Sequence, residues 1–359
     1  MKVCILGFNL TSLTLAKMLV NQKINVDISF CKKPQGYDKS RTLGISKSNV
    51  EFFNKNIINI EKIIWKLKRI EIFTDNLKKK ESLLNFEKKY DQIFSIAKNY
   101  QLLELIEKSL SKNMFFKKLF STNYLLNFDA YDLVINTDYL HPITKKYFSK
   151  KTIKKYNSIA FTTLIKHEKI DNRTASQIFT RRGPLAFLPI SKTQTSIVYS
   201  IHNSTNKKKD NIEELVNHYN YKYNIIAFGN LSSFELNSLN LRSYYHKNIL
   251  AFGDLLHKIH PLAGQGFNMT LRDIKVLLSL IKNKIELGLP LDQSVNSEFE
   301  KISKHKNYLF SNGIDFVQEF FNLERKSKSN VLSKSIQLLG NNPSIKNLFI
   351  KIADRGEYF

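Results

Sequence analysis

The stretch NILAFGDLLHKIHPLAGQGFNMTLRD, residues 248–273, carries the most information in the chain. It predicts a buried strand that ends in Gly-Asp, then a loop, then a Gly-Gln-Gly turn that opens a helix. Asp254 at the strand end can accept a hydrogen bond from a sugar-like hydroxyl, and Gly253 lets the backbone come close to a ligand. Gly264 and Gly266 leave successive N–H groups free to face an acceptor at the helix N-terminus. A plain loop between a strand and a helix would also contain glycine and proline, but it would not explain the whole string.

The start of the chain predicts a parallel sheet. Residues 2–7 form a buried-strand run, apolar residues at helical spacing follow, and Val26–Phe30 read as a second strand. A strand, a helix and a strand within about 30 residues form a βαβ unit, which joins parallel strands by a right-handed crossover. We expect Tyr131–Asn136 and Ile249–Gly253 to be further apolar strands of this sheet.

The pattern changes between residues 158 and 202, where β-branched residues alternate with others. This alternation predicts a second, mainly antiparallel sheet. Its expected strands are Ser158–His167, Thr174–Thr180, Leu185–Pro189 and Ser196–Ser200, with an earlier strand at Ile70–Asp75. Helices are expected at Ser46–Asn56, Tyr100–Leu110, Ile212–Tyr219 and Gly266–Lys284.

Length and composition exclude several classes of protein. With 359 residues, 42% of them apolar, the chain can form two packed domains with a large core. No apolar run approaches the ~20 residues that span a bilayer. The N-terminus does not have the pattern of a cleaved signal peptide, so we expect a cytoplasmic protein. Cys4 and Cys31 suit core packing in a reducing compartment better than a disulfide framework. No metal site is expected.

The net charge of +25 raises nucleic acid and anionic membranes as possible partners. The basic residues are spread along the whole chain, and neither a basic nucleic-acid motif nor a stacking pattern of aromatic residues is present. We therefore expect no nucleic-acid partner, whereas peripheral docking at the inner face of a membrane fits the charge. Residues 310–359 mix apolar residues with lysines, as a basic amphipathic surface does. A helix packed on its own domain would have the same composition.

The 248–273 string resembles the flavin-contacting motif of the class A flavoprotein monooxygenases, and in detail that of the ubiquinone-biosynthesis hydroxylases. Their pattern is close to Gly-Asp-Ala-Ala-His, two residues, then His-Pro-Leu-Ala-Gly-Gln-Gly-x-Asn. The resemblance implies that Asp254 contacts the ribityl chain of FAD and that Pro261 lies near the flavin face where oxygen reacts. It also implies that the isoalloxazine ring is held by Gly264, Gln265, Gly266, Phe267 and Asn268. Leu255 and Leu256 replace two alanines of the family, and their bulk could crowd the flavin.

Other segments extend the resemblance over nearly the whole chain. RTLGIS, residues Arg41–Ser46, is similar to the family's Arg-x-Leu-x-Leu-Ser, whose arginine reaches towards the cofactor. SQIFTRRGPLAFLP, residues Ser176–Pro189, is similar to the family's substrate-sheet strands. Asn99 stands where the family has an asparagine before a helix, which implies a contact with the cofactor. We expect His167 and Gln177 to be satisfied polar residues at sheet edges rather than catalysts.

The resemblance is weaker at the N-terminus. The family has Gly-x-Gly-x-x-Gly after the first strand, where the pyrophosphate binds, and only Gly7 of the three glycines is present. Asn9, which tolerates unusual backbone angles, and Ser12, which can donate to a phosphate, stand at the other two positions. Phe30 replaces the acid that holds the adenosine ribose. Asp138 is kept from the family's third motif and is expected to contact the cofactor.

The resemblance implies an FAD-dependent aromatic-ring monooxygenase of ubiquinone biosynthesis. An external donor such as NAD(P)H would reduce the flavin, and dioxygen would add to it to give a flavin hydroperoxide. One oxygen would then pass to the ring of a polyprenylated phenol or quinone precursor. The candidate catalytic residues are Arg41, His260 and Pro261, and His257 is a further candidate for proton transfer. Other ubiquinone-biosynthesis proteins are the expected protein partners.

These patterns together predict an α/β fold like that of para-hydroxybenzoate hydroxylase. It combines a Rossmann-like FAD-binding domain, built on a parallel sheet, with a mainly antiparallel substrate sheet and a helical C-terminus. The expected division assigns residues 1–69, 96–157 and 241–300 to the FAD-binding domain, 70–95 and 158–240 to the substrate domain, and 301–359 to the helical region.

Two other functions compete with this one. A flavin-free relative could serve as a scaffold in a ubiquinone-biosynthesis complex, which the lost glycines and the lost ribose acid favour and the retained 248–273 string opposes. An NAD-dependent dehydrogenase is favoured less, because the missing ribose acid would weaken it equally and the late Gly-Asp motif would have no explanation.

Overall fold

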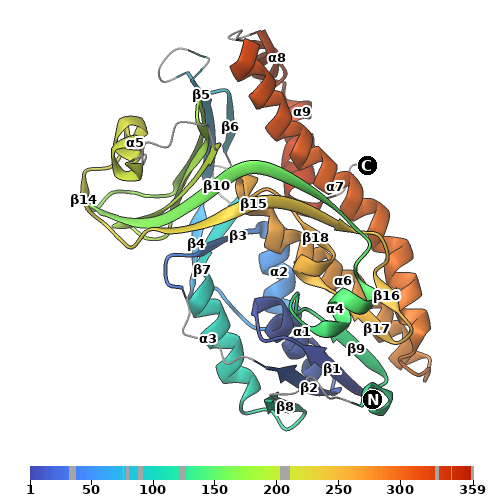
Figure 1. Ribbon diagram of the computed structural model, residues 1–359. Helices are drawn as coiled ribbons and strands as arrows, with labels where there is room; N and C mark the ends of the chain where they lie inside the picture. Colours follow the sequence, from blue (N-terminus) through green and yellow to red (C-terminus); the bar gives the residue numbers. More distant parts are fainter. Residues whose placement is uncertain are drawn as a thin grey trace.

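Two large sheets and one small sheet form the framework of the protein, and three C-terminal helices run along one side of it (Figure 1). The computed structural model describes residues 1–31, 38–75, 77, 81–87, 92–120, 127–202, 211–327, 331–340 and 342–356.

The first large sheet has the strand order β16-β17-β9-β1-β2-β8, and all neighbours are parallel except β16 and β17. Its strands are β1 (Lys2–Leu6), β2 (Asn25–Phe30), β8 (Phe116–Phe120), β9 (Leu133–Asn136), β16 (Tyr245–His246) and β17 (Ile249–Ala251). The chain therefore returns to this sheet after long excursions, since β9 and β17 come from distant parts of the sequence.

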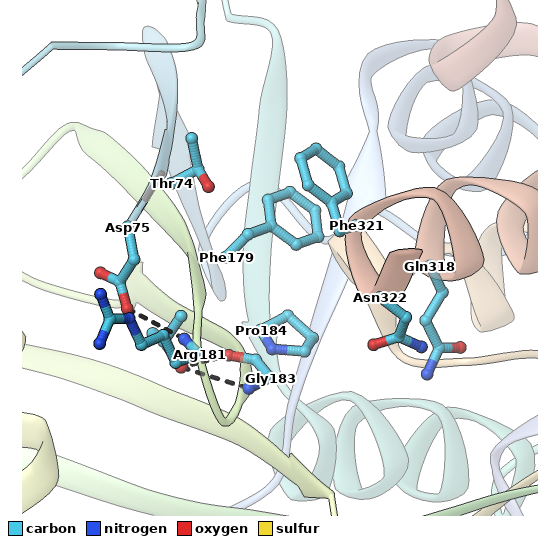
Figure 2. A pocket seen from close by; sticks show the side chains of 10 residues that line it. Thr74, Asp75, Phe179, Arg181, Gly183, Pro184, Gln318, Phe321 and Asn322 are labelled. Carbon is cyan, nitrogen blue, oxygen red and sulfur yellow. Dashed lines mark hydrogen bonds between the residues drawn. The ribbon is translucent and has the colours of Figure 1, made fainter. Parts of the chain in front are cut away.

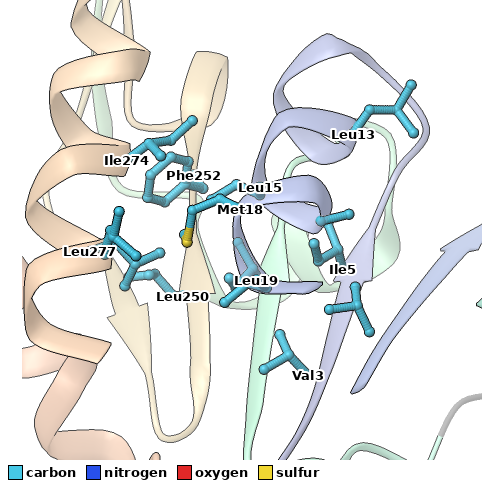
Figure 3. Close-up of a cluster of buried hydrophobic side chains, with 14 of the residues drawn as sticks. Val3, Ile5, Leu13, Leu15, Met18, Leu19, Leu250, Phe252, Ile274 and Leu277 are labelled. Carbon is cyan, nitrogen blue, oxygen red and sulfur yellow. The ribbon is translucent and has the colours of Figure 1, made fainter. Parts of the chain in front are cut away.

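Helix α1 (Leu10–Asn21) packs on β1 and β2 of this sheet, and α3 (Asn99–Leu110) and α6 (Gln265–Glu286) pack against α1. Because β1 lies at the centre of the sheet, its residues after Lys2 are all buried. Leu15, Met18 and Leu19 of α1 face Ile274 and Leu277 of α6, with Leu250 of β17 beside them, and all six belong to the main hydrophobic core (Figure 3). The core places the N-termini of α1 and α6 at the same edge of the sheet.

The second large sheet has nine strands, and the pair β11 and β5 is parallel whereas the other neighbours are antiparallel. Its strands are β5 (Arg69–Thr74), β6 (Leu84–Glu87), β10 (Lys151–His167), β11 (Thr174–Thr180), β12 (Gly183–Pro189), β13 (Gln194–His202), β14 (Ile225–Phe228), β15 (Ser232–Leu241) and β18 (His257–Lys258). Helix α5 (Ile212–Tyr219) buries Ile212 and Val216 against this sheet.

A small antiparallel sheet joins the two larger ones. It consists of β3 (Thr42–Ser46), β7 (Phe94–Lys98) and β4 (Ile64–Leu67), and helix α2 (Lys47–Asn56) follows β3 directly. The remaining short elements are η1 (Phe128–Ala130), α4 (Pro142–Tyr147), η2 (Gly253–Leu255) and η3 (Leu262–Gly264). Strand β3 contacts α6, so the small sheet supports the start of that helix.

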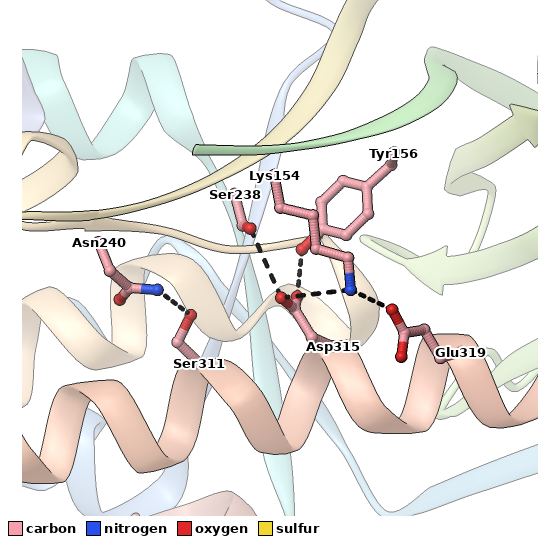
Figure 4. Close-up of polar contacts among 7 residues, drawn as sticks. All are labelled: Lys154, Tyr156, Ser238, Asn240, Ser311, Asp315 and Glu319. Atoms are coloured by element: carbon pink, nitrogen blue, oxygen red, sulfur yellow. Dashed lines mark hydrogen bonds and ion pairs between the residues drawn. The ribbon is translucent and has the colours of Figure 1, made fainter. Parts of the chain in front are cut away.

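Helix α7 (Gln293–Ser327) passes both large sheets, and α8 (Val331–Gly340) and α9 (Pro343–Arg355) follow it. Asp315 of α7 accepts hydrogen bonds from the Tyr156 and Ser238 hydroxyls of β10 and β15, and Lys154 pairs with Glu319 (Figure 4). Further along, the rings of Phe179 and Phe321 stack with their centroids 3.6 Å apart, beside Pro184 (Figure 2). No helix in the described ranges is both long and apolar enough to cross a bilayer.

Most of the expected elements are confirmed. The helix predicted at Ile212–Tyr219 is α5 with the same bounds, and the strand predicted at Tyr131–Asn136 is β9, which pairs in parallel with β1. Strand β8 was not predicted, because its two lysines in FKKLF obscure the apolar alternation of an edge strand. The expectation that both cysteines fill the core is wrong for Cys31, which lines a cavity, whereas Cys4 is fully buried.

Gly253 provides a test of the contact between the β17 turn and α1. Its φ of 66° is left-handed, and an added Cβ would lie 2.8 Å from Thr11 Cγ2. Gly288 has almost the same φ, 67°, but an added Cβ there would meet nothing within 4 Å. We predict that Gly288→Ala costs about 1 kcal/mol of unfolding free energy, from backbone strain alone. Gly253→Ala should cost about 3 kcal/mol, because a steric clash adds to the strain. Equal losses for the two variants in chemical denaturation would contradict the close approach of Gly253 to α1.

Candidate functional site

A cavity of about 720 Å³ lies between the carboxyl ends of the parallel strands and one face of the nine-stranded sheet. One wall comes from the turn after β1, the end of β2, strand β3, the start of α3, the loop after β9 and the segment from η2 to α6. The opposite wall comes from β10, β11, β12, β13 and β15. Open α/β sheets bind ligands at the carboxyl ends of their strands, and the size suits a small molecule or a cofactor.

The N-terminus of α6 opens onto this cavity, and no side chain of the described residues caps it. Gly264, its N-cap residue, has a left-handed φ of 64°, and an added Cβ would lie 3.3 Å from the backbone of Gly44. An added Cβ on Gly266 would meet nothing within 4 Å, because this residue faces the cavity. The absence of a side chain at Gly266 leaves a space, here called the open seat, beside the positive end of the α6 dipole. Such a seat suits a flat acceptor group that carries negative charge.

Asn268 holds the start of α6 against β3 and α2. Its amide oxygen accepts hydrogen bonds from Ser46 N and Asn49 Nδ2, both at 2.9 Å. Its amide nitrogen donates to the carbonyl oxygens of Gly44, at 3.0 Å, and Gly264, at 3.2 Å. Asn268 is fully buried and does not line the cavity, so it positions the α6 turn and faces away from the ligand space.

Asp254 is exposed and lines the cavity, as expected of a residue that meets a sugar-like hydroxyl. The two leucines that follow it, Leu255 and Leu256, are 3% and 0% exposed and belong to the main core. Neither of them lines the cavity. The expectation that they crowd a flavin is therefore wrong, because their side chains point into the core.

The turn after β1 is built differently from a three-glycine turn. Gly7 has a φ of 101°, and an added Cβ would lie 2.9 Å from Thr137 Oγ1. Asn9 has ordinary extended angles, so its tolerance of unusual angles is not used. Its side-chain oxygen caps α1 by accepting from Ser12 N, and its amide donates to Thr137 Oγ1 at 3.1 Å. The Ser12 hydroxyl donates back to Asn9 O, so Ser12 completes the cap and does not line the cavity. The side chain of Asn9 thus occupies one amide, Ser12 N, at the end of the helix where a phosphate binds in a three-glycine turn.

The end of β2 is aromatic. The ring of Phe30 lies 4.9 Å from that of Phe8 and 5.7 Å from that of Phe120, and the Lys118 ammonium lies 5.1 Å from the Phe8 ring. Phe8 and Phe30 line the cavity. This end of the cavity therefore has flat apolar rings and a nearby cation where an acid would hydrogen-bond a ribose. Such a surface suits an aromatic base better than a sugar.

The opposite wall presents one row of side chains from four neighbouring strands. Thr162 lies opposite Val198, Val198 opposite Ala186, and Ala186 opposite Gln177 in the register of the sheet. All four line the cavity, with the apolar pair in the middle. Gln177 was expected at a sheet edge, but β11 lies between β12 and β5, so that part of the expectation is wrong. His167 is buried and bonded to Thr195 and to the carbonyl of Glu168, as expected.

The structure brings most of the candidate residues together and leaves some outside the cavity. Those that line it are Gly7, Asn9, Arg41, Asn99, Asp138, Asp254, Pro261, Gly264, Gly266 and Phe267. Those that do not are Ser12, Gly253, Gln265, Asn268 and His260. Gln265 accepts a hydrogen bond from Arg272 instead. Phe8 and Thr162 were missed, because a turn or strand pattern fixes which residues alternate without showing which face meets a ligand.

The residues present fit a flavin at the α6 end of the cavity. The open seat at Gly266, the uncapped helix N-terminus and the exposed carboxylate of Asp254 suit a flat, electron-rich ring with a hydroxylated chain. The α1 end fits the adenosine portion through the aromatic faces of Phe8 and Phe30 in place of a carboxylate.

His260 is 1% exposed, and among the described residues neither of its ring nitrogens has a hydrogen-bond partner. Its ring packs edge-on against Tyr156, with the centroids 5.1 Å apart. Burial in these surroundings lowers the pKa of His260 from 6.5 to about 4. The imidazole is therefore neutral at pH 7, and it lies behind the cavity wall rather than in it.

The low pKa of His260 predicts a loss of stability in acid. The unfolded chain takes up a proton between about pH 6.5 and pH 4 that the folded protein does not, so the unfolding free energy falls as the pH falls through this window. The loss should reach about 3 kcal/mol below it. His260→Phe keeps a ring against Tyr156 and removes the titration. We expect this variant to lose about 3 kcal/mol less than the unsubstituted protein between pH 7 and pH 4 in denaturant titrations. Identical pH dependence in the two proteins would contradict the burial of a neutral imidazole.

No protein-family model matches the chain. Its fold matches solved FAD-dependent monooxygenases along nearly its full length. HpxO of Klebsiella pneumoniae, solved with FAD and uric acid, aligns with a TM-score of 0.77 and 11% identity over 99% of this chain and 96% of that one. The p-nitrophenol 4-monooxygenase PnpA of Pseudomonas putida aligns with a TM-score of 0.77 and 11% identity over 98% and 97%. The fold is therefore the one that these solved FAD-dependent monooxygenases share.

Curated proteins resemble parts of the sequence. The ubiquinone biosynthesis monooxygenase COQ6 of Dictyostelium discoideum is 30% identical over 127 residues, 35% of this chain and 26% of that protein. COQ6 of Drosophila melanogaster is 22% identical over 262 residues, 61% and 55%. The 3-demethoxyubiquinol 3-hydroxylase of Escherichia coli is 26% identical over 152 residues, 40% and 39%. The matches thus span between a quarter and just over half of these relatives. Over these parts, the sequence is similar to ubiquinone-biosynthesis hydroxylases.

Proposed function

We propose that the protein binds FAD in the 720 Å³ cavity and hydroxylates the aromatic ring of a polyprenylated ubiquinone precursor. The open seat at Gly266, beside the uncapped N-terminus of α6 and inside a cavity shared with the antiparallel sheet, is the observation that carries the proposal. The named relatives are ubiquinone hydroxylases, and HpxO and PnpA share the fold, which supports the same activity class.

Particular residues would hold the cofactor. Asp254 would accept hydrogen bonds from the hydroxylated chain, and the first amides of α6 would face the electron-rich edge of the ring. Arg41 and Asn99 lie at the same cavity, and the backbone N–H of Asn99 donates to the Arg41 carbonyl at 3.0 Å, which fixes the two relative to each other. When bound, FAD supplies the chemistry that activates dioxygen after reduction by an external donor such as NAD(P)H. The protein orients the ring of the substrate and excludes water.

The antiparallel wall is suited to an aromatic ring. Val198 and Ala186 form a small apolar floor, and Thr162 and Gln177 flank it with polar groups. A ring with oxygen substituents can lie on such a floor while its polar edges meet the flanking side chains. This arrangement supports a phenol or quinone precursor as the substrate.

Gly266 is the position that tests flavin binding. The purified protein should take up FAD and absorb at about 450 nm. Gly266→Leu should place its side chain in the open seat and weaken FAD binding by about 100-fold. The unfolding free energy should stay the same or rise by up to about 1 kcal/mol, because leucine is a better helix former than glycine. Gly288→Ala, at the far end of α6, is the control and should bind FAD normally.

The scaffold function predicts a different outcome of the same titration. A folded protein that stays colourless with excess FAD, and for which Gly266→Leu changes nothing, would favour a flavin-free relative within a ubiquinone-biosynthesis complex. The retained seat at α6 opposes this alternative, because a chain without flavin has no physical need for an open space at Gly266.

Membrane contact through the C-terminal helices is also part of the proposal, because a polyprenylated substrate resides in the bilayer. Phe316 and Leu323 of α7 are 68% and 64% exposed and lie seven residues apart on one helix face. The net charge of +25 would favour an anionic surface. A cytoplasmic protein docked peripherally at the inner face of the membrane, together with other ubiquinone-biosynthesis proteins, is consistent with both features.

Vesicle binding tests this contact. Replacing Phe316 and Leu323 together by serine should lower co-sedimentation with anionic phospholipid vesicles by about tenfold, because two exposed apolar side chains no longer enter the interface. The unfolding free energy should change little. Ile226→Ser, at a 69% exposed residue of β14, is the matched control and should pellet normally. Equal pelleting of the double variant and the control would exclude α7 as the contact.

A further inference from the structure

His257, the further candidate for proton transfer in the 248–273 string, has the contacts of an oriented base. Its Nε2 lies 2.5 Å from Oδ2 of Asp273, and the two side chains are 1% and 2% exposed. The other carboxylate oxygen of Asp273 accepts a hydrogen bond from Asn307 Nδ2 at 2.9 Å. Three elements, β18, α6 and α7, thus hold one carboxylate behind one imidazole.

His257 lines the cavity, whereas His260 does not. Within the part of the chain that the structure describes, its Nδ1 has no hydrogen-bond partner, so this nitrogen is available to a ligand. A carboxylate bonded to one nitrogen fixes the orientation of an imidazole and stabilises it when the other nitrogen takes a proton. The cavity side of His257 is therefore placed to exchange protons with a molecule bound there.

Charged and titratable groups surround this pair from several elements. Asp254 of η2 and Lys258 of β18 line the same cavity, as does Arg41, which directly precedes β3. Behind the pair, Tyr244 donates its backbone N–H to Glu300 of α7, at 2.9 Å. Glu300 in turn pairs with Lys304, at 2.8 Å. Within this set, Asp273 is the group bonded directly to the imidazole, so its carboxylate dominates the field at His257.

We propose that His257, positioned by Asp273, is the base that accepts the hydroxyl proton of a phenolic substrate in the cavity. The O–H bond of the phenol breaks, an N–H bond forms at Nδ1, and the phenol keeps the electron pair as phenolate. The imidazolium that results is balanced by the Asp273 carboxylate. A phenolate ring is more electron-rich than a phenol ring. The phenolate is therefore the form that an electrophilic oxygen attacks. This inference rests on the proposed monooxygenase function and assigns its proton acceptor.

A probe without turnover tests the assignment. p-Nitrophenol is added to the FAD-loaded, oxidised protein with no electron donor, and the absorbance of its anion gives the ionised fraction of the bound probe. At a pH below that at which the free phenol ionises, the unsubstituted protein should hold mostly the anion. His257→Gln and Asp273→Asn should each lower the ratio of anion to neutral phenol by about tenfold or more.

His246→Gln is the matched control, because His246 stacks on Tyr147 outside the cavity and should leave the ratio unchanged. Flavin absorbance is recorded for every variant, so loss of FAD binding is separated from loss of proton transfer. Bound FAD together with an ionised fraction equal to that of the free phenol, or unbound p-nitrophenol, would overturn the assignment. An unchanged ratio in both His257→Gln and Asp273→Asn would overturn it as well. Asp273→Asn is nearly isosteric and serves if His257→Gln does not fold.

Discussion

The site depends on the four hydrogen bonds of the buried Asn268 amide. They tie α6 to β3 and α2 and hold the backbones of Gly44 and Gly264 in contact. Because both neighbours are glycines, the first turn of α6 can approach β3 closely and turn its free amides into the cavity. An amide side chain can satisfy donors and acceptors on both sides of such a junction, whereas an apolar residue would leave four buried polar groups unpaired. The open seat at Gly266 is a consequence of this junction.

The two ends of the cavity follow different physical principles. At α6, bare backbone amides and the helix dipole are offered to a ligand. At α1, Asn9 and Ser12 satisfy the equivalent amides from within the chain, and Phe30 stands where an acid would bind a ribose. The first arrangement gains its hydrogen bonds only when an acceptor arrives. At α1 the amides already have hydrogen-bond partners within the chain. Binding of the nucleotide tail there therefore depends on the aromatic surfaces and on Gly7, whose backbone lies close to Thr137.

The sequence alone predicted the fold and which segments form the site, but it did not predict which side chains of those segments face the cavity. The βαβ start, the return of β9 and β17 and the antiparallel sheet followed from apolar periodicity, which is a strong signal for buried strands. The sequence could not show which polar side chains point into the cavity and which point away from it. Asn268 and Gln265 belong to the motif but do not line the cavity. His260, a predicted catalytic residue, does not line it either, whereas His257 does. The carboxylate that holds His257 is itself held by Asn307 of α7, fifty residues further along the chain, which a local motif does not show.

With FAD bound as proposed, the ring end of the cavity supplies most of the affinity for the cofactor. Parallel equilibrium titrations of the same protein with FAD, FMN and ADP measure this directly. The structure predicts that FMN, which carries the ring and the ribityl chain, binds nearly as tightly as FAD, and that ADP binds far more weakly than either. Binding of ADP as tight as that of FAD, with no measurable binding of FMN, would contradict the account.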